Sequence, residues 1–150
     1  MSEHRARITW RREGADFSYE SYGRDHDWQF GTGSSLRASG AAEYRGNPAL
    51  PNPEEALVAA LSSCHMLTFL ALAARRGVAV DAYDDDAEGH LEKNAEGRLA
   101  VTRVTLRPRV RFAGAPPDAE TVATLHAQAH KGCFIANSVK TEVRVEPSEV

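Results

Sequence analysis

Two cysteines are the residues of this sequence whose type most readily does chemistry. Cys64 lies in the middle of a long uncharged stretch, and Cys133 follows Gly132 toward the end of the sequence. A cysteine can act as a nucleophile, ligate a metal, take part in a redox cycle or pack as a small apolar side chain. The residues around each cysteine decide between these roles.

One hypothesis is that Cys64 and His65 form a nucleophile–base pair of the hydrolase type, because His65 follows Cys64 directly. Adjacent helical residues project about 100° apart, so their side chains do not face each other. No glycine-rich turn surrounds the pair either. We therefore set the hydrolase reading aside.

A metal site is a second reading, because His126 and His130 are spaced i, i+4, which suits a metal ion. However, Cys64 and His65 cannot easily ligate one ion from two sides of a helix, and the sequence has no Cys-x-x-Cys motif. We expect no metal and no cofactor. A third reading, a redox pair formed by the two thiols, remains open beside simple packing.

The stretch that carries Cys64 has the signals of one long helix. Asn52 suits the N-cap, Pro53 the first helical position, and Glu55 the capping-box position three residues after the cap. Arg75 and Arg76 fall in the last turn, and Gly77 can adopt the left-handed conformation that ends a helix.

This helix carries no fixed charge from Ala56 to Ala74. A helix that is apolar all round is either buried or crosses a membrane. The content of the stretch argues against a membrane span, because much of it is alanine and it contains the polar residues Ser62, Ser63, His65 and Thr68. We expect a central helix that the rest of the protein wraps, and no membrane partner.

The composition fits one domain over residues 1–150, with enough chain for a hydrophobic core. The net charge of −3 gives no indication of a nucleic-acid partner. The polar start, Met1 to Arg5, is not followed by the apolar core of a signal peptide, and two cysteines are too few for a secreted disulfide scaffold. These features favour a cytoplasmic protein.

The first third of the chain shows strand patterns. Residues 7–11 and 17–20 alternate in polarity and predict a hairpin, and residues 22–28 resemble a solvated loop. A turn at residues 31–33 precedes a third strand within residues 35–42.

After Gly77 the pattern has period two. Residues 80–91 and 98–112 predict a hairpin around the turn at 93–97. If Lys93 pairs with Arg98, Glu88 lies opposite Arg103 and Asp84 opposite Arg107. Such cross-strand ion pairs neutralise the arginine row, which consists of Arg103, Arg107, Arg109 and Arg111. We therefore interpret the row as a solvated sheet face rather than a phosphate or nucleic-acid site.

Asp118 caps a predicted second helix that ends near His130 or Lys131, and a last strand covers residues 139–145. The order is strands, long helix, strand hairpin, helix, strand. Segregated runs of this kind predict an α+β fold rather than a doubly wound sheet.

Two motifs resemble the OsmC/Ohr family of hydroperoxide reductases. One is Asn52-Pro53-Glu54-Glu55 followed by an Ala-rich stretch and Ser62-Ser63-Cys64, with Glu54 and Cys64 ten residues apart. The other runs from His130 to Ser138 and contains Cys133 just before a terminal strand. Residues 22–25 are also similar to the family's Gly-Arg-Asp turn, and the resemblance covers nearly the whole chain.

The resemblance implies an OsmC-like fold with antiparallel sheets around the long helix, in an intertwined homodimer. It also implies a hydroperoxide reductase in which the Cys64 thiolate attacks the peroxide and Cys133 resolves the sulfenic acid to a disulfide. An external thiol then regenerates the pair, and in the organic hydroperoxide branch this is a dihydrolipoyl group, which a lipoylated protein carries. His65, Phe134 and Ile135 depart from the common pattern, which leaves the peroxide and the reductant open.

Arg24 and Glu54 complete the expected site. Cys64 lies about three turns into its helix, beyond the reach of the helix dipole, so its thiolate needs a cation such as Arg24. Glu54 would be the carboxylate partner of Arg24. Ten residues of unbroken helix rise about 15 Å, which is too far for one arginine to serve Glu54 and Cys64 of the same chain. We therefore expect Glu54 to act across a two-fold dimer.

An alternative of a different class stays open at this point. The protein could be a non-enzymatic small-molecule-binding protein in which both thiols are buried and inert. The roles of His26, His65 and His130 also stay open.

Overall fold

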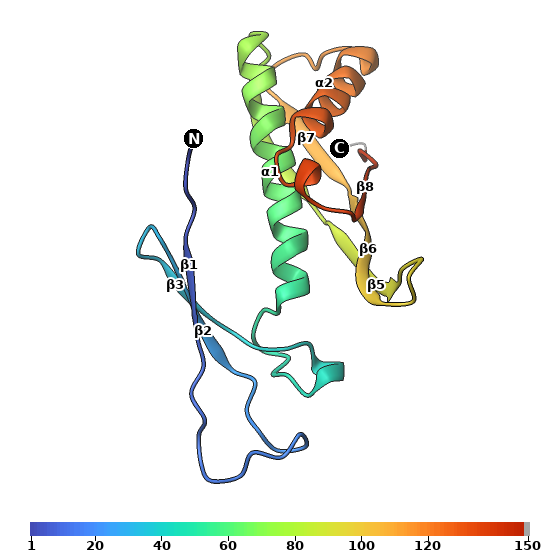
Figure 1. Cartoon of the computed structure of the whole chain (residues 1–150). Helices are drawn as coiled ribbons and strands as arrows, with labels where there is room; N and C mark the ends of the chain where they lie inside the picture. Colours follow the sequence, from blue (N-terminus) through green and yellow to red (C-terminus); the bar gives the residue numbers. More distant parts are fainter. Residues whose placement is uncertain (149–150) are drawn as a thin grey trace. The chain divides into compact units, whose positions relative to one another are not determined.

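The computed structural model describes residues 1–148 and groups the chain into two compact units, Met1–Ala56 and the chain from Leu57 onward (Figure 1). Helix α1 (Pro53–Arg75) begins in the first unit and continues through the second. Both units contain β-sheet, and both long helices lie mainly or wholly in the second. The predicted α+β class is confirmed.

The first unit is built on a three-stranded antiparallel sheet of β1 (Ala6–Thr9), β2 (His26–Phe30) and β3 (Ser35–Ala38). Trp28 in the central strand pairs with Ile8 on one side and with Leu36 on the other. The predicted turn between β2 and β3 is confirmed, with Gly33 at a φ of 90°. The third strand is confirmed but ends at Ala38.

The predicted hairpin between residues 7–11 and 17–20 is wrong. Residues 19–21 form a turn, and next to it the Asp16 carboxylate accepts hydrogen bonds from the Ser18 N–H and the Ser21 hydroxyl. Such local bonds offer the backbone an alternative to strand pairing. The partner of β1 is β2, so His26 and Trp28 belong to a strand and not to the loop that the sequence suggested.

A short 3-10 helix, η1 (Ala42–Tyr44), leads from this sheet toward α1. The chain crosses itself closely on either side of η1. A Cβ on Gly46 would lie 1.6 Å from the carbonyl oxygen of Gly40, so only glycine fits at position 46.

The predicted caps of α1 are confirmed. The Glu55 N–H donates to Asn52 Oδ1 at 2.9 Å, and the Asn52 N–H donates to Glu55 Oε2 at 3.1 Å, which is the reciprocal bonding of a capping box. At the other end Gly77 has a φ of 69°, and the Val78 N–H donates back to the Ala73 carbonyl at 3.0 Å. The helix runs without a break from Pro53 to Arg75.

The second unit contains two small sheets. One pairs β4 (Val80–Asp85) with β7 (Pro108–Phe112), and the other has the order β5 (Glu88–Lys93), β6 (Leu99–Leu106), β8 (Glu142–Val145). Each predicted long strand is thus divided in two. Most pairings are antiparallel as predicted, but β6 and β8 run parallel.

The register predicted for this hairpin is wrong. Lys93 pairs with Leu99, Glu88 with Thr105 and Asp84 with Arg109. The turn takes an extra residue because Gly97 adopts a φ of 75° and the Asn94 side chain accepts the N–H groups of Glu96 and Arg98.

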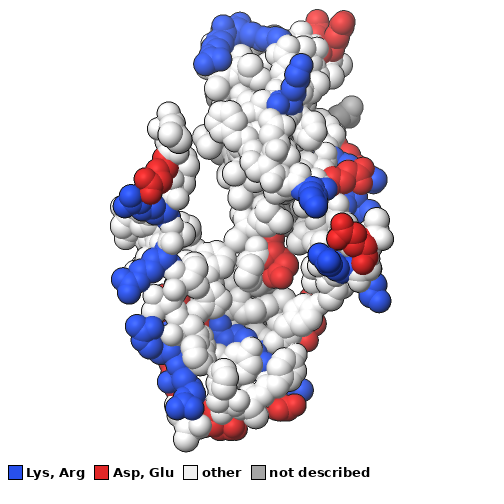
Figure 2. Space-filling model, in the orientation of Figure 1, with Lys and Arg blue, Asp and Glu red and all other residues white. Residues whose placement is uncertain are grey.

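The arginine row still meets carboxylates, although not the predicted ones. Arg107 pairs with Glu88 at 3.0 Å and Arg109 with Asp86 at 2.8 Å, and all four side chains are substantially exposed. Figure 2 shows basic and acidic side chains side by side over β5 and β6. Exposed pairs of this kind contribute little to stability, but they neutralise two arginines of the row, Arg107 and Arg109.

Helix α2 (Ala119–Gly132) begins at Asp118, whose carboxylate accepts the Thr121 N–H at 2.7 Å, as predicted. A 3-10 helix, η2 (Ala136–Ser138), follows before β8.

Helix α1 contributes to both hydrophobic clusters of the second unit. Phe69 and Ala73 pack with α2 and β7, and Leu61 packs with β6. Together with His65 these residues form one buried stripe along the helix.

The opposite stripe of α1 is exposed, which corrects the expectation that the chain wraps this helix on all sides. The exposed stripe consists of Ala59, Ser63, Leu67 and Ala71. Leu67 has 63% of its surface exposed. By length and composition alone α1 could also cross a membrane. Its buried stripe instead packs against α2 and the sheets, which is what a core helix of a globular protein does.

Candidate thiol site

Cys64 lies in the middle of α1, half-buried and with a free thiol. It sits between the exposed stripe that contains Ser63 and the buried stripe that contains His65. One turn further on, the Thr68 hydroxyl donates to the Cys64 carbonyl at 2.9 Å. The thiol is therefore carried on a rigid element and is accessible to a small solute.

Cys133 caps the C-terminus of α2, has a free thiol and is 1% exposed. Its N–H donates to the His130 carbonyl, and its Sγ accepts the Ala136 N–H at 3.4 Å. Burial raises the pKa of the Cys133 thiol above its ordinary value, and the neighbouring Cys64 thiol raises it further. The hydrogen bond from Ala136 acts in the opposite direction.

The two thiols come together because α2 ends against α1. A Cβ on Gly132 would lie 3.2 Å from Thr68 Cγ2, which is tighter than an ordinary van der Waals contact. The absence of a side chain at position 132 lets the residue before Cys133 approach the turn that follows Cys64. The structure thus brings together two of the four predicted site residues.

The environments of the two thiols suit different tasks. A buried thiol with a raised pKa stays protonated at neutral pH and is a poor first nucleophile. The half-exposed Cys64 can be reached from solvent. The Ala136 N–H offers a donor to negative charge that develops on the Cys133 sulfur.

Arg24, the third predicted residue, belongs to the first unit. Its guanidinium donates to the carbonyls of Tyr19 and Tyr22 and lies 3.6 Å from the centroid of the Tyr22 ring. Its Nε is buried and has no hydrogen-bond partner among residues 1–148. Cation–π stacking and carbonyl bonds therefore fix the position of Arg24 within its own loop.

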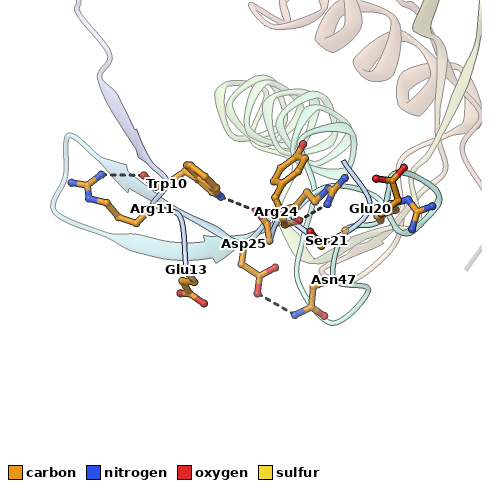
Figure 3. A pocket seen from close by; sticks show the side chains of 12 residues that line it. Trp10, Arg11, Glu13, Glu20, Ser21, Arg24, Asp25 and Asn47 are labelled. Carbon is orange, nitrogen blue, oxygen red and sulfur yellow. Dashed lines mark hydrogen bonds between the residues drawn. The ribbon is translucent and has the colours of Figure 1, made fainter. Parts of the chain in front are cut away.

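Arg24 lines a pocket of about 310 Å³ within the first unit (Figure 3). Charges of both signs surround it, among them Arg11, Glu20 and Arg45. The Trp10 indole N–H donates to the Gly23 carbonyl at 2.8 Å, which holds the segment that contains Arg24 against β1.

Glu54, the fourth predicted residue, lies in the first turn of α1. Its Oε2 is buried and unpaired in the part of the chain that the structure describes, and no ion pair joins it to Arg24 there. The structure of one chain therefore leaves the predicted Arg24–Glu54 pair unformed, with an unsatisfied buried atom on each partner.

A pair of buried histidines was missed by the sequence reasoning. His65 Nε2 and His126 Nδ1 lie 3.1 Å apart, and the two residues are 1% and 4% exposed. Burial lowers the pKa of each imidazole to about 4, so both are neutral at pH 7. The signal was present in the sequence, because each histidine occupies the apolar face of its helix.

Asp85 is a further, half-buried polar residue that the sequence reasoning missed. It ends β4 and accepts the Ser62 hydroxyl at 2.5 Å and the Arg107 N–H at 2.6 Å. Within residues 1–148 no three metal-ligating side chains gather. His126, one of the two residues with metal-ligand spacing, is bonded to His65 instead.

Similar solved structures share this architecture over nearly their full length. An OsmC-like protein of unknown function from Vibrio cholerae is 45% identical, with a TM-score of 0.95 and coverage of 99% of this chain and 100% of that one. An organic hydroperoxide resistance protein from Legionella pneumophila is 19% identical, with a TM-score of 0.70 and coverage of 99% and 96%. The organic hydroperoxide resistance protein OhrB of Bacillus subtilis is 19% identical, with a TM-score of 0.65 and coverage of 97% and 98%.

No curated protein matches the sequence. The family model described as OsmC-like protein matches residues 46–148, which include both cysteines. This match spans more than half of the chain and agrees with the 45% identical structure. The chain belongs to the OsmC-like protein family.

Proposed function

We propose that this protein is a thiol-dependent hydroperoxide reductase. Two similar structures are named organic hydroperoxide resistance proteins, which suggests a peroxide-related role at a coarse level. The observation that carries the finer proposal is the pairing of unlike thiols, a half-exposed Cys64 beside a buried Cys133 with a raised pKa.

In the proposed reaction the Cys64 thiolate attacks one peroxide oxygen and the O–O bond breaks. The departing alkoxide takes up a proton and leaves as an alcohol, and Cys64 becomes a sulfenic acid. The Cys133 sulfur then attacks the Cys64 sulfur. The S–O bond breaks, and the hydroxide leaves as water with the proton that Cys133 loses.

Regeneration needs an external thiol reductant, which attacks the disulfide and leaves both cysteines reduced. A dithiol such as a dihydrolipoyl group, free or on a lipoylated protein, is the reductant we propose. We also propose that the enzyme works in the cytoplasm, where such reductants keep thiols reduced.

Arg24 and Glu54 complete the proposed site as thiolate-stabilising cation and carboxylate partner. Each has a buried polar atom without a partner in the described chain, a costly state that a second chain would relieve. The uncovered stripe of α1 around Leu67 is an apolar surface for that second chain. We therefore propose a homodimer in which each site uses both chains.

A thiol count tests the proposal directly. The reduced protein should show two titratable thiols under denaturing conditions, and one equivalent of cumene hydroperoxide should remove both within seconds to minutes. Dihydrolipoamide should restore them. A protein that only binds small molecules would keep both thiols after the peroxide, and that result would exclude the reductase.

A further inference from the structure

The buried contact between His65 and His126 has a specific geometry. The ring planes are 4° from parallel and the centroids are 5.4 Å apart, while Nε2 and Nδ1 are 3.1 Å apart. This centroid separation equals the N···N distance plus the two ring radii. The imidazoles therefore lie end to end in one plane, joined by an in-plane N–H···N hydrogen bond rather than by face stacking.

The number of ring protons shows why the two imidazoles have to stay aligned. Two neutral imidazoles carry two ring protons, and one of them fills the inner contact. The outer atoms, His65 Nδ1 and His126 Nε2, are buried without partners among the residues described. Any shift that separated the rings would leave four buried ring nitrogens unsatisfied instead of two, at a substantial cost.

The pair joins the two helices that carry the thiols. His65 follows Cys64 on α1, and His126 lies about two turns before Cys133 on α2. The same helices meet again where Gly132 approaches Thr68. The histidine bond and the glycine contact therefore fix α2 against α1 at two separate points.

Apart from one exposed hydrogen bond, in which the Arg76 guanidinium just after α1 donates to Gln128 Oε1 of α2 at 2.8 Å, the remaining contact between these helices is apolar. Phe69 and Ala73 of α1 pack in one cluster with Leu125 and Ala129 of α2. Apolar contact is non-directional, and it specifies helix register less strictly than a buried polar pair does. The histidines can thus supply the alignment that these apolar side chains do not.

We propose that His65 and His126 are positioning residues for the thiol pair, holding α2 in the register that places Cys133 against Cys64. This inference rests on the proposed function only in assigning a use to the Cys64–Cys133 disulfide. Neither histidine needs to touch the peroxide. Their effect is exerted through the position of Cys133.

The surroundings of the pair favour neutral rings that keep this bond. Phe69 packs on His126 with ring centroids 4.4 Å apart, and Tyr83 in turn packs on Phe69. Two nearby charged or titratable groups act on the pair, His130 on His65 and the Asp85 carboxylate on His126. The Tyr83 hydroxyl is buried in the same cluster.

The test measures the effective concentration of Cys133 at Cys64. The protein is equilibrated in glutathione buffers of stepped redox ratio, and the fraction of intramolecular disulfide is read after acid quenching. His126→Leu should lower the effective concentration by about tenfold or more, because the hydrogen bond that aligns α2 with α1 is lost. The double variant His65→Gln with His126→Asn places amides at the two bonding positions and should recover it to within about threefold.

Leu125→Ala is the matched control. Leu125 is fully buried on the same helix, so its truncation costs stability without removing the polar bond. It should lower the thermal midpoint while leaving the effective concentration within about threefold of wild type. The inference is overturned if Leu125→Ala lowers the effective concentration as much as His126→Leu does, if His126→Leu leaves it unchanged, or if the amide pair fails to recover it.

The glutathione equilibrium involves no peroxide, so it separates this inference from the proposed function. A protein that forms the disulfide normally in glutathione but ignores hydroperoxides would overturn the reductase proposal and leave the positioning role standing. A wild-type protein that forms no disulfide at any glutathione ratio would overturn the positioning role itself.

Discussion

Cys64 and Cys133 are neighbours in space but not in environment. Cys64 is half-buried in the middle of a helix, whereas Cys133 is 1% exposed at the end of another helix, with a pKa raised by burial and by Cys64 itself. A thiol held protonated reacts slowly with peroxide, whereas a thiol beside a sulfenic acid is well placed to complete a disulfide once it gives up its proton. In the proposed reaction this asymmetry favours Cys64 as the attacking thiol and Cys133 as the resolving one.

The first prediction separates the two roles by substitution. Cys64→Ser should lose all peroxide consumption, because the attacking sulfur is gone. Cys133→Ser should still consume about one equivalent of cumene hydroperoxide and stop at sulfenic or sulfinic acid. Intact-protein mass spectrometry after a timed peroxide pulse would show the added oxygen. Loss of the first oxidation in Cys133→Ser alone would reverse the assignment.

The second prediction concerns Arg24. A guanidinium near the sulfur stabilises the thiolate, so Arg24→Ala should slow alkylation of Cys64 by iodoacetamide at pH 7 by about tenfold. Peroxide consumption should slow by a similar factor. Arg24→Lys retains the charge and should keep part of the rate.

An unchanged alkylation rate in Arg24→Ala would identify another residue as the activating cation. The next candidates are the arginines near the N-terminus, Arg5, Arg7, Arg11 and Arg12. Of these, Arg11 lines the same pocket as Arg24.

Local signals explain what could be predicted from the sequence. The caps at Asn52, Glu55 and Gly77 are formed by residues within a few positions of each other, and the structure has them as predicted. The N-cap of α2 is also formed locally, by Asp118 and the Thr121 N–H. The two cysteine motifs indicated the family, and the structure places both thiols together.

Non-local contacts explain what could not be predicted. The partner of β1 was misassigned because pairing depends on which distant strand is free, and the segment around the turn at residues 19–21 is hydrogen-bonded to Asp16 instead. A one-residue difference at the Gly97 turn and a second register shift between His90 and Leu91 together moved the partner of Glu88 by two residues, from the predicted Arg103 to Thr105. The apolar helix faces of His65 and His126 indicated that both are buried, but their pairing across 61 positions has no local signature. The i, i+4 spacing of His126 with His130 made His126 resemble a metal ligand instead.

The third prediction is an acid loss of stability from the histidine pair. The pKa values of His65 and His126 fall from 6.5 to about 4 on folding, so between these values the unfolded chain binds more protons than the folded one. The free energy of unfolding should therefore be fully retained above pH 6.5 and fall as the pH drops toward 4. The expected loss is roughly 3 kcal/mol for each histidine.

Urea titrations at half-unit steps from pH 7 to pH 4 would measure this loss. The double variant His65→Gln with His126→Asn has no imidazole at either position, so its stability should vary much less over the same range. An equally steep loss in the double variant would mean that other groups govern acid sensitivity.

The fourth prediction uses the close approach of Gly132 to Thr68. Gly132→Ala adds a Cβ at 3.2 Å from Thr68 Cγ2, and the β-branched threonine has little freedom to move aside. We expect a destabilisation of about 1 kcal/mol and slower disulfide formation, because the end of α2 is pushed away from Cys64. Differential scanning calorimetry and a peroxide-quench assay measure the two effects.

Thr68→Ser is the compensating change, because it removes the crowded methyl group and keeps the hydroxyl that bonds to the Cys64 carbonyl. In the double variant both stability and disulfide formation should return toward the values of Thr68→Ser alone. If the effects of the two substitutions simply add in the double-mutant cycle, positions 132 and 68 are not in steric conflict.

The last prediction concerns assembly, and it follows from an unbroken helix. Because α1 is continuous from Pro53 to Arg75, Glu54 and Cys64 are separated by about 15 Å of rise along one chain. Glu54 Oε2 and Arg24 Nε are both buried without partners in the chain as described, and the stripe of α1 around Leu67 is uncovered. A two-fold dimer in which Glu54 of one chain serves the site of the other would account for all three features.

Two variants that are each inactive should therefore complement each other. Glu54→Ala and Cys64→Ser chains, unfolded together and refolded as a mixture, should regain activity of up to about a quarter of the wild-type level, because half of the dimers are hybrids and each hybrid has one intact site. Leu67→Glu should place a charge in the interface and shift sedimentation toward the monomer, with loss of activity, while Leu99→Glu, at another exposed leucine, should do neither. A wild-type protein that sediments as a fully active monomer at micromolar concentration would contradict the shared site.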